Sequence, residues 1–416
     1  MQLPKYSFGM GDRFAHQGEA QLRAVVRAKE EGADIAPVWN KSNREHQTVG
    51  STPAATWQEA AEATAALGWE APYFVDADHI NLTNVEPFVD QANFFTIDVA
   101  DYIGQPVSPQ EVDEFVMTHF EYVGDLAIPG IEVPFEISEA FLRKVAEQYL
   151  GAAKEAGKIY RYLAERKGED GFVAEVSMDE VPAPQTPPEL LFILSMLARE
   201  HVKAQTIAPK FSGRFNKGVD YVGNVEQFAL EFEADVAVIA FAVKKFGLPA
   251  NLKLSVHTGS DKFSLYPEIH RIIRKHDAGV HLKTAGTTWL EELIGLAAAG
   301  GEALEMTKEM YQYAHAHYEE LTKPYANVID VSLDKLPDPK EVSGWSADQM
   351  VHALEHDPHH PQFNSSFRQL MHTAYKLAAQ RGEQFYRLLK EHRTAVGKRV
   401  TYNLLERHIR PLFLGK

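Results

Sequence analysis

Acids, histidines and lysines stand at or just after the ends of eight short apolar segments of this sequence. The segments are rich in β-branched, aromatic and aliphatic residues, which is typical of β-strands. In α/β barrels the carboxyl ends of the strands gather on one face and carry the functional groups. Imidazoles and carboxylates together suit metal binding or proton transfer, and lysines suit anion or imine chemistry. The groups are Arg13, Lys41, Asp78, His79, Asp98, Glu175, Lys210, His257, His281 and Lys283.

The alternation of side chains along a strand predicts which of these groups point inward. In the segment that ends at His257, the aliphatic residues share one face, so the imidazole lies on the other. The same reasoning turns Glu175 inward on its segment. It also turns His281 and Lys283 inward together, because the apolar residues between and before them face the helices. These side chains are therefore expected inside a closed sheet.

The third segment, Phe74-Val-Asp-Ala-Asp-His79, is ambiguous. Asp76 and Asp78 lie two residues apart and share one face of a regular strand. His79 reaches that face only if the regular strand has ended by Ala77. The sequence leaves this point open.

His79, Glu175 and His257 follow the third, fifth and seventh segments. Alternate strands of a barrel contribute side chains to the same layer, so these three groups can converge on one point. Two imidazoles and a carboxylate suit a catalytic divalent metal ion with positions left for substrate oxygens. Zn, Mn, Ni and Co all remain open as the metal. The alternative is that each imidazole is only hydrogen-bonded, which is common for a single inward-facing histidine.

Lysines form a second group of candidates. Lys210 and Lys283 lie within strand-end segments, where an ammonium group needs a carboxylate or an anionic ligand to offset its partial burial. A Schiff-base lysine is the alternative, and anion binding is favoured because the nearby imidazoles and Glu175 point to a metal as the electrophile. Lys262 can equally be a solvated charge at the rim.

Eight strand-like segments that alternate with helical stretches predict an α/β fold, a (β/α)8 TIM barrel. The predicted strands are residues 6–10, 35–39, 73–77, 94–97, 172–176, 206–210, 252–257 and 279–283. The predicted helices between them are residues 18–31, 56–67, 188–203, 225–246, 265–275 and 288–299.

Two regions fall outside the alternation. Residues 100–170 read as a mostly helical insertion after strand four, with one long helix over 138–167. We therefore expect a catalytic barrel over residues 1–300 that includes this insertion. Residues 301–416 are dominated by helical stretches and are expected to form a C-terminal extension packed on the barrel.

Composition narrows the class of protein. The 416 residues carry 42 Lys and Arg against 58 Asp and Glu, a formal net charge of −16, which disfavours nucleic acid and anionic membranes as partners. There is no cysteine, so a metal must use His, Asp or Glu. No segment approaches 18 consecutive apolar residues and no signal peptide is recognisable, so a cytoplasmic protein is expected. The oligomeric state stays open, a homo-oligomer included.

Nucleotide cofactors are disfavoured. Gly9-Met-Gly11 follows a strand, but Phe14 stands where a dinucleotide fingerprint needs its third glycine. No phosphate-binding P-loop is present either. An epimerase that works by transient oxidation with bound NAD is therefore unfavourable.

Several segments resemble known families. The Asp78-His79 pair, Glu175 and the segment from His257 to Ser260 resemble class II fructose-bisphosphate aldolases, although Lys210 stands where those enzymes place another metal histidine. Nearly the whole chain more closely resembles the tagaturonate epimerase family. The segments that carry this second resemblance are Phe8–Phe14, Phe74–His79, Ala174–Val176, His257–Phe263, His281–Gly286 and Asn364–Arg368.

The resemblance implies a metal-dependent barrel isomerase of hexuronate catabolism that interconverts tagaturonate and fructuronate. Related enzymes also accept ketohexoses such as fructose and tagatose. The inverted carbon, C4, lies β to the ketone, so retro-aldol cleavage and re-addition can invert it. We assign catalytic roles to Asp78, Glu175, Lys210 and Lys283, with Asp78 as the proton shuttle. Substrate contacts are assigned to Arg13, Lys41, Asp261, Lys262 and His281.

Two competing functions stay open. The first is a class II-like aldolase that cleaves a keto sugar or sugar acid and releases free three-carbon products. The second is a sugar-acid binding protein without catalytic activity. The second is disfavoured because so many ionisable strand ends point toward one place.

Overall fold

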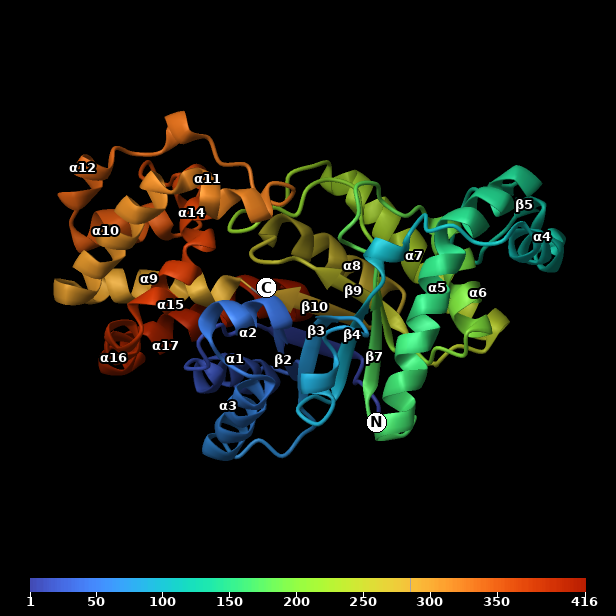
Figure 1. Cartoon of the computed structure of the whole chain (residues 1–416), viewed down its shortest axis with the longest axis horizontal. Coiled ribbons are helices and arrows are strands. Elements are labelled where there is room, and N and C mark those ends of the chain that lie inside the picture. The colour runs from blue at the N-terminus through green and yellow to red at the C-terminus, as the bar shows by residue number, and fades with distance from the viewer. Residues whose placement is uncertain (285) are drawn as a thin grey trace.

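The computed structural model describes residues 1–284 and 286–416. Ala285, within the His281–Gly286 segment of the family resemblance, lies outside the described residues. Among those residues, eight parallel strands close into a barrel in the order β1-β2-β3-β4-β7-β8-β9-β10 (Figure 1). Each strand begins within one residue of its predicted start, so the predicted (β/α)8 barrel is confirmed. The strands are β1 (Tyr6–Met10), β2 (Ala36–Ser42), β3 (Phe74–Ile80), β4 (Phe94–Asp98), β7 (Val173–Ser177), β8 (Thr206–Ala208), β9 (Lys253–His257) and β10 (Val280–Thr284).

Helices cover the outside of the barrel, where the outward faces of the strands present apolar side chains. None of the helices within residues 1–284 and 286–416 combines the length and apolar character that crossing a lipid bilayer requires. The barrel helices are α1 (Gly18–Glu30), α2 (Asn43–Val49), α3 (Pro53–Ala66), α5 (Glu139–Lys167), α6 (Pro187–Arg199), α7 (Val225–Phe246), α8 (Tyr266–Lys275) and α9 (Thr287–Ala299).

The inside of the barrel has an apolar floor and a polar layer above it. The floor is a separate cluster of buried side chains: Leu3, Ala36, Val38, Phe74, Phe94 and Val173. Two residues further along the same strand faces, the polar layer begins with Asp76, Thr96 and Glu175. Because side chains alternate along a strand, the sequence spacing alone puts these groups in one layer facing the barrel axis.

The insertion between β4 and β7 projects from one side of the barrel (Figure 1). It contains α4 (Pro109–Thr118) and a two-stranded hairpin of β5 (Gly124–Leu126) and β6 (Phe135–Ile137). The predicted long helix is present as α5, which packs against β4 and α6 and so belongs to the barrel wall.

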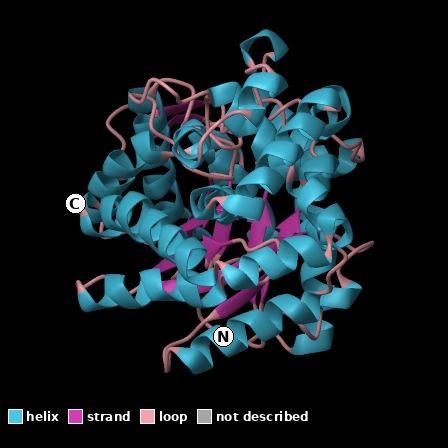
Figure 2. Cartoon of the chain, turned by 90° about the vertical axis from the view of Figure 1, so that its left-hand side faces the viewer, coloured by secondary structure: helices cyan, strands magenta, loops and turns pink. Residues whose placement is uncertain are grey.

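The C-terminal extension packs against α9, α1 and α8 on the other side of the barrel (Figures 1 and 2). The division into two domains at residue 300 stays a prediction. The helices of the extension are α10 (Gly301–Ala316), α11 (Tyr318–Thr322), α12 (Pro339–Ser343), α13 (Ala347–Leu354), α14 (Ser365–Thr373), α15 (Tyr375–Arg381), α16 (Glu383–Glu391), α17 (Arg393–Tyr402) and the π-helix η7 (Asn403–Leu414).

Asp261, in the loop after β9, joins the extension to the barrel. Its fully buried carboxylate accepts hydrogen bonds from Arg368 Nη2 at 2.6 Å and Thr287 Oγ1 at 3.2 Å. His356 Nδ1 lies 3.0 Å and His408 Nε2 3.2 Å from its oxygens. Burial would raise the pKa of Asp261, but the Arg368 guanidinium holds it well below its usual range. Three parts of the extension therefore meet on one ionised carboxylate.

We expect Asp261→Ala to lower the free energy of unfolding by about 3 to 5 kcal/mol, because it leaves the Arg368 charge buried without a partner. Urea unfolding curves measure this loss. Glu320→Ala is the matched control, because Glu320 pairs with Lys376 at the surface and its loss is expected to cost about 1 kcal/mol or less. Equal unfolding midpoints for the two variants would contradict the structural role of Asp261.

Candidate active site

A β-bulge in β3 brings two consecutive residues to the barrel mouth. Ala77 pairs with Phe95 of β4, whereas Ile80 pairs with Ile97, so β3 contains one residue more than its partner. His79 lies inside this bulge with a φ of 56°, in the left-handed backbone region that residues other than glycine rarely adopt. The bulge resolves the ambiguity of the sequence, since it lets both His79 and the aspartate before it reach the mouth.

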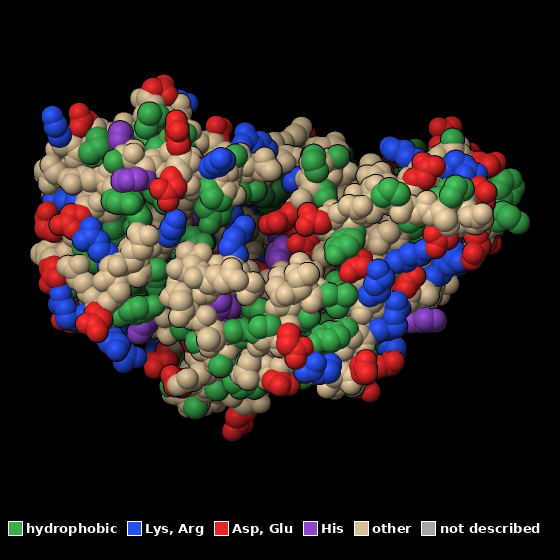
Figure 3. Space-filling model, viewed as in Figure 1, with side chains coloured by type: hydrophobic (Ala, Val, Ile, Leu, Met, Phe, Trp, Pro, Cys, Tyr) green, Lys and Arg blue, Asp and Glu red, His purple; other side chains and the backbone are tan. Residues whose placement is uncertain are grey.

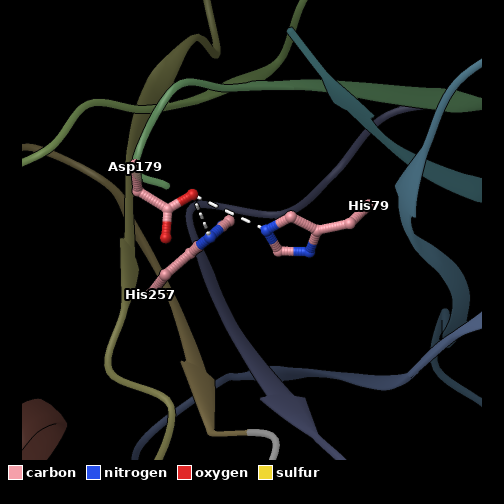
Figure 4. A group of neighbouring side chains, drawn as sticks. All are labelled: His79, Asp179 and His257. Carbon is pink, nitrogen blue, oxygen red and sulfur yellow. Dashed lines mark ion pairs between the residues drawn. The ribbon is translucent and has the colours of Figure 1, made fainter. Parts of the chain in front are cut away.

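His79, Asp179 and His257 form a group that can hold a metal ion (Figure 4). One ligand atom from each lies within 4.8 Å of the others, and Asp179 Oδ1 is 3.1 Å from His257 Nδ1 and 3.6 Å from His79 Nε2. Both nitrogens are buried and lack a hydrogen-bond partner among the described residues. Two imidazoles and a carboxylate fit a divalent transition metal and leave coordination positions for a substrate.

The second nitrogen of each imidazole is held by a carboxylate. His79 Nδ1 lies 2.8 Å from Asp78 Oδ1, and His257 Nε2 lies 2.7 Å from Glu175 Oε1. Such carboxylate–imidazole pairs fix the tautomer and the ring orientation of metal-binding histidines. The donor set therefore has the outer contacts that a metal site requires.

Lys283 lies beneath this group and links the carboxylates. Its ammonium nitrogen is 2.9 Å from Asp76 Oδ2, 3.0 Å from Asp78 Oδ1 and 2.9 Å from Glu175 Oε1. It also donates to Thr96 Oγ1 at 2.6 Å. One cation thus contacts three buried carboxylates in the polar layer of the barrel.

The charges in this layer determine its protonation. Burial would lower the pKa of the Lys283 ammonium, but Asp76 and Asp78 raise it well above its ordinary value. Burial would likewise raise the pKa of Glu175, but Lys283 and His257 hold it well below its usual range. Burial raises the pKa of Asp76 to about 7 despite Lys283. A Lys283 that stays protonated does not suit imine formation, which needs the free amine.

Comparison with known proteins identifies the family. A family model described as tagaturonate epimerase, UxaE, matches residues 1–412. The chain belongs to the tagaturonate epimerase family. It is therefore an isomerase.

Two relatives extend the comparison. The chain is 28% identical to the tagaturonate/fructuronate epimerase of Thermotoga maritima over 93% of this chain and 79% of the relative. It is 25% identical to fructuronate-tagaturonate epimerase UxaE of Cohnella laeviribosi in a glycerol-complexed crystal structure, with a TM-score of 0.82 over 99% of this chain and 82% of that one. The native crystal structure of the same enzyme gives a TM-score of 0.79 at 24% identity.

In this tagaturonate epimerase family member, the carboxylate that sequence reasoning missed is Asp179. It lies two residues beyond β7, with 23% of its side chain exposed, and it faces both imidazoles. Glu175, predicted as the ligand, lies deeper and contacts His257 through the other ring nitrogen. Its role as a ligand stays a prediction. Alternation from Glu175 through Ser177 would place Asp179 on the same inward face. That rule applies only within a strand, however, and β7 ends at Ser177.

The predicted basic residues at the mouth have different surroundings. Lys210 is half-buried, and its ammonium group lies 3.4 Å from the carbonyl oxygen of Asp179. Lys41 is almost fully buried and donates to the carbonyl oxygen of Arg13 at 2.5 Å. Arg13 Nε donates to Glu45 at 3.0 Å. The predicted roles of these three basic residues in catalysis and substrate binding are compatible with their positions and stay predictions.

Three further predicted substrate contacts are deeply buried. Asp261 is occupied by the extension as described above. Lys262 is fully buried rather than at the rim, and it donates to the carbonyl oxygens of Asn216 and Val219 at 2.9 and 2.8 Å. His281 lies one inward position below Lys283, where burial lowers its pKa to about 3. Their assignment as substrate contacts stays a prediction.

The two carboxylates near His257 can be told apart by metal affinity. We expect Glu175→Gln to weaken binding of Mn²⁺ or Zn²⁺ about 10- to 100-fold, because Glu175 contacts the His257 imidazole rather than the metal ion. We expect Asp179→Asn to weaken binding more, because it removes a metal ligand. Calorimetric titration of the chelator-treated protein measures both affinities. A greater loss in Glu175→Gln would return the ligand role to Glu175.

Proposed function

We propose that this protein interconverts tagaturonate and fructuronate by inverting C4, with a divalent metal held by His79, Asp179 and His257. The observation that carries the proposal is a pair of buried imidazole nitrogens that face the same carboxylate oxygen and have no hydrogen-bond partner within the described part of the chain. Membership of the tagaturonate epimerase family supports the substrate. The relatives from Thermotoga maritima and Cohnella laeviribosi are named for both sugar acids.

Each residue of the site has a defined task in this reaction. His79, Asp179 and His257 would hold a divalent metal, which would supply Lewis-acid stabilisation of the negative charge that develops on the substrate. Asp78 uses Oδ1 for both His79 and Lys283, so Oδ2 is the oxygen that accepts the proton of the C4 hydroxyl. Lys283 keeps Asp78 and Glu175 ionised, and Lys210 beside Asp179 binds a substrate oxygen.

The proposed chemistry is retro-aldol cleavage, because the hydrogen on C4 is not acidified by a ketone two carbons away. The C4 hydroxyl gives its proton to Asp78, the C3–C4 bond breaks, and its electron pair moves to C3 and the ketone oxygen. The resulting three-carbon aldehyde turns and presents its other face. The C3–C4 bond then forms again, and Asp78 returns the proton to the C4 oxygen.

The competing functions differ in their products. An aldolase releases the two three-carbon fragments, whereas an epimerase retains them until the bond is restored. A sugar-acid binding protein shows no turnover with any divalent metal. Turnover of fructose and tagatose is a further property proposed for this site, because these ketoses present the same ketone and C4 hydroxyl.

We expect chelation to abolish formation of fructuronate from tagaturonate and added Mn²⁺, Zn²⁺, Ni²⁺ or Co²⁺ to restore it, because the metal supplies the charge stabilisation for bond cleavage. Chromatography of the two sugar acids, with metal analysis of each sample, measures the effect. Full activity of a metal-free sample would exclude the proposed role of His79, Asp179 and His257.

Isotope labelling tests the bond-breaking step. In deuterated water we expect the epimerised product to carry no deuterium on C4, because that hydrogen stays on the aldehyde fragment throughout. Proton NMR of the product measures the label. Deuterium on C4 would replace cleavage by direct deprotonation, and accumulation of free three-carbon products would favour the aldolase.

A further inference from the structure

A group of basic residues lies beside the candidate metal group. Most of these residues have no role in the reaction described above. Arg13 follows β1, Arg44 lies in α2, and Lys217 lies in the loop after β8. We call these three residues the cation cluster. Figure 3 shows Lys and Arg atoms on one side of a central hollow of the molecule and Asp and Glu atoms on the other.

Two tyrosines of the extension hold the cation cluster together. The Arg13 guanidinium lies 4.0 Å from the centre of the Tyr375 ring. Arg44 and Lys217 both lie over the Tyr325 ring, at 5.7 and 5.9 Å from its centre. The two phenolic oxygens are 3.0 Å apart. Stacking on aromatic faces fixes the position of a cation without neutralising its charge.

The positive charge of the cluster is only partly compensated. Arg13 is 5% exposed and pairs with Glu45, but its Nη1 is buried and has no hydrogen-bond partner among residues 1–284 and 286–416. In the part of the chain that the structure describes, the side chains of Arg44 and Lys217 form no hydrogen bond or ion pair. A buried guanidinium nitrogen without an acceptor is costly unless a ligand oxygen supplies one. The cluster therefore has the donors of an oxyanion site.

The cation cluster adjoins the candidate metal group. Lys217 lies next to Gly259, two residues after His257, because a methyl group built on Gly259 would be 4.0 Å from Lys217 Nζ, an ordinary contact distance. On the other side, Ser42, the last residue of β2 and the residue before α2, pairs with Asp78 of β3. A pocket of about 610 Å³ opens beside the cluster, between α2 and the extension, and is lined in part by Arg44 and both tyrosines.

We propose that Arg13, Arg44 and Lys217 bind the carboxylate of the keto acid and so select it over a neutral ketose. The inference rests on the proposed function and adds the residues that recognise the acid end of the substrate. The ketone and the carboxylate lie toward opposite ends of a six-carbon chain, which matches a metal group and a cation cluster side by side. Arginine binds carboxylates through paired N–H donors, and Lys217 adds a point charge.

The first test compares acid and neutral substrates of the metal-loaded enzyme. We expect Lys217→Met to raise KM for tagaturonate about 10- to 100-fold, because one charge-assisted contact is lost. KM for tagatose is expected to change little, since it has a hydroxymethyl group in place of the carboxylate. Arg44→Gln, at an exposed position, is expected to act in the same direction. Equal losses on both substrates would overturn the proposal.

A binding experiment makes the result independent of turnover. Calorimetry with gluconate and glucitol, which differ only in the carboxylate, is expected to show tighter binding of gluconate to the wild type and loss of that preference in Lys217→Met. Lys376→Met is the matched control, because Lys376 lines the same pocket but pairs with Glu320 at 3.1 Å.

The outcomes separate the two proposals. A wild type that prefers gluconate but does not epimerise tagaturonate would overturn the proposed function and leave the carboxylate site in place. A Lys217→Met variant that keeps the preference, or a Lys376→Met variant that loses it, would overturn the carboxylate site.

Discussion

One buried ammonium group, that of Lys283, holds the polar layer of the barrel together. Three carboxylates around a fully enclosed space repel one another strongly unless a cation compensates them. With Lys283 among them, Asp78 and Glu175 stay ionised and accept hydrogen bonds from the imidazoles above. The orientation of both histidines, and with it the candidate metal group, therefore depends on a contact that lies below the barrel mouth.

Above this layer the mouth is divided by charge. The carboxylates and imidazoles come from β3, β7 and β9, whereas the cation cluster comes from the loops after β1 and β8 and from α2. Such a division suits a substrate with two different ends. One end is anionic, and the other is uncharged and carries oxygens that a metal can polarise. Although the protein carries a formal net charge of −16, three basic side chains gather at this edge of the mouth.

The extension contributes to the site as well as to stability. Its helices meet the barrel on the carboxylate of Asp261, and its tyrosines, Tyr325 and Tyr375, stack on the basic residues of the mouth. Asp261 follows β9 by four residues, close to His257. The contact that docks the extension thus lies in the loop that directly follows His257 at the end of β9. The placement of the two tyrosines is therefore linked to the placement of the metal-binding candidate.

The sequence by itself determined the barrel and the inward direction of its strand-end groups, because period-two alternation is local and needs no knowledge of neighbouring strands. The rule that alternate strands share a layer also predicted the imidazoles of His79 and His257 in one group, although alternation left the direction of His79 open. Only the tertiary structure decided how the donor set is completed. The bulge at His79, the reach of Asp179 beyond its strand and the stacking of Arg13 on Tyr375 all depend on contacts between segments far apart in the chain. Local patterns carry no information on such contacts, since loop conformation is fixed by what packs against it.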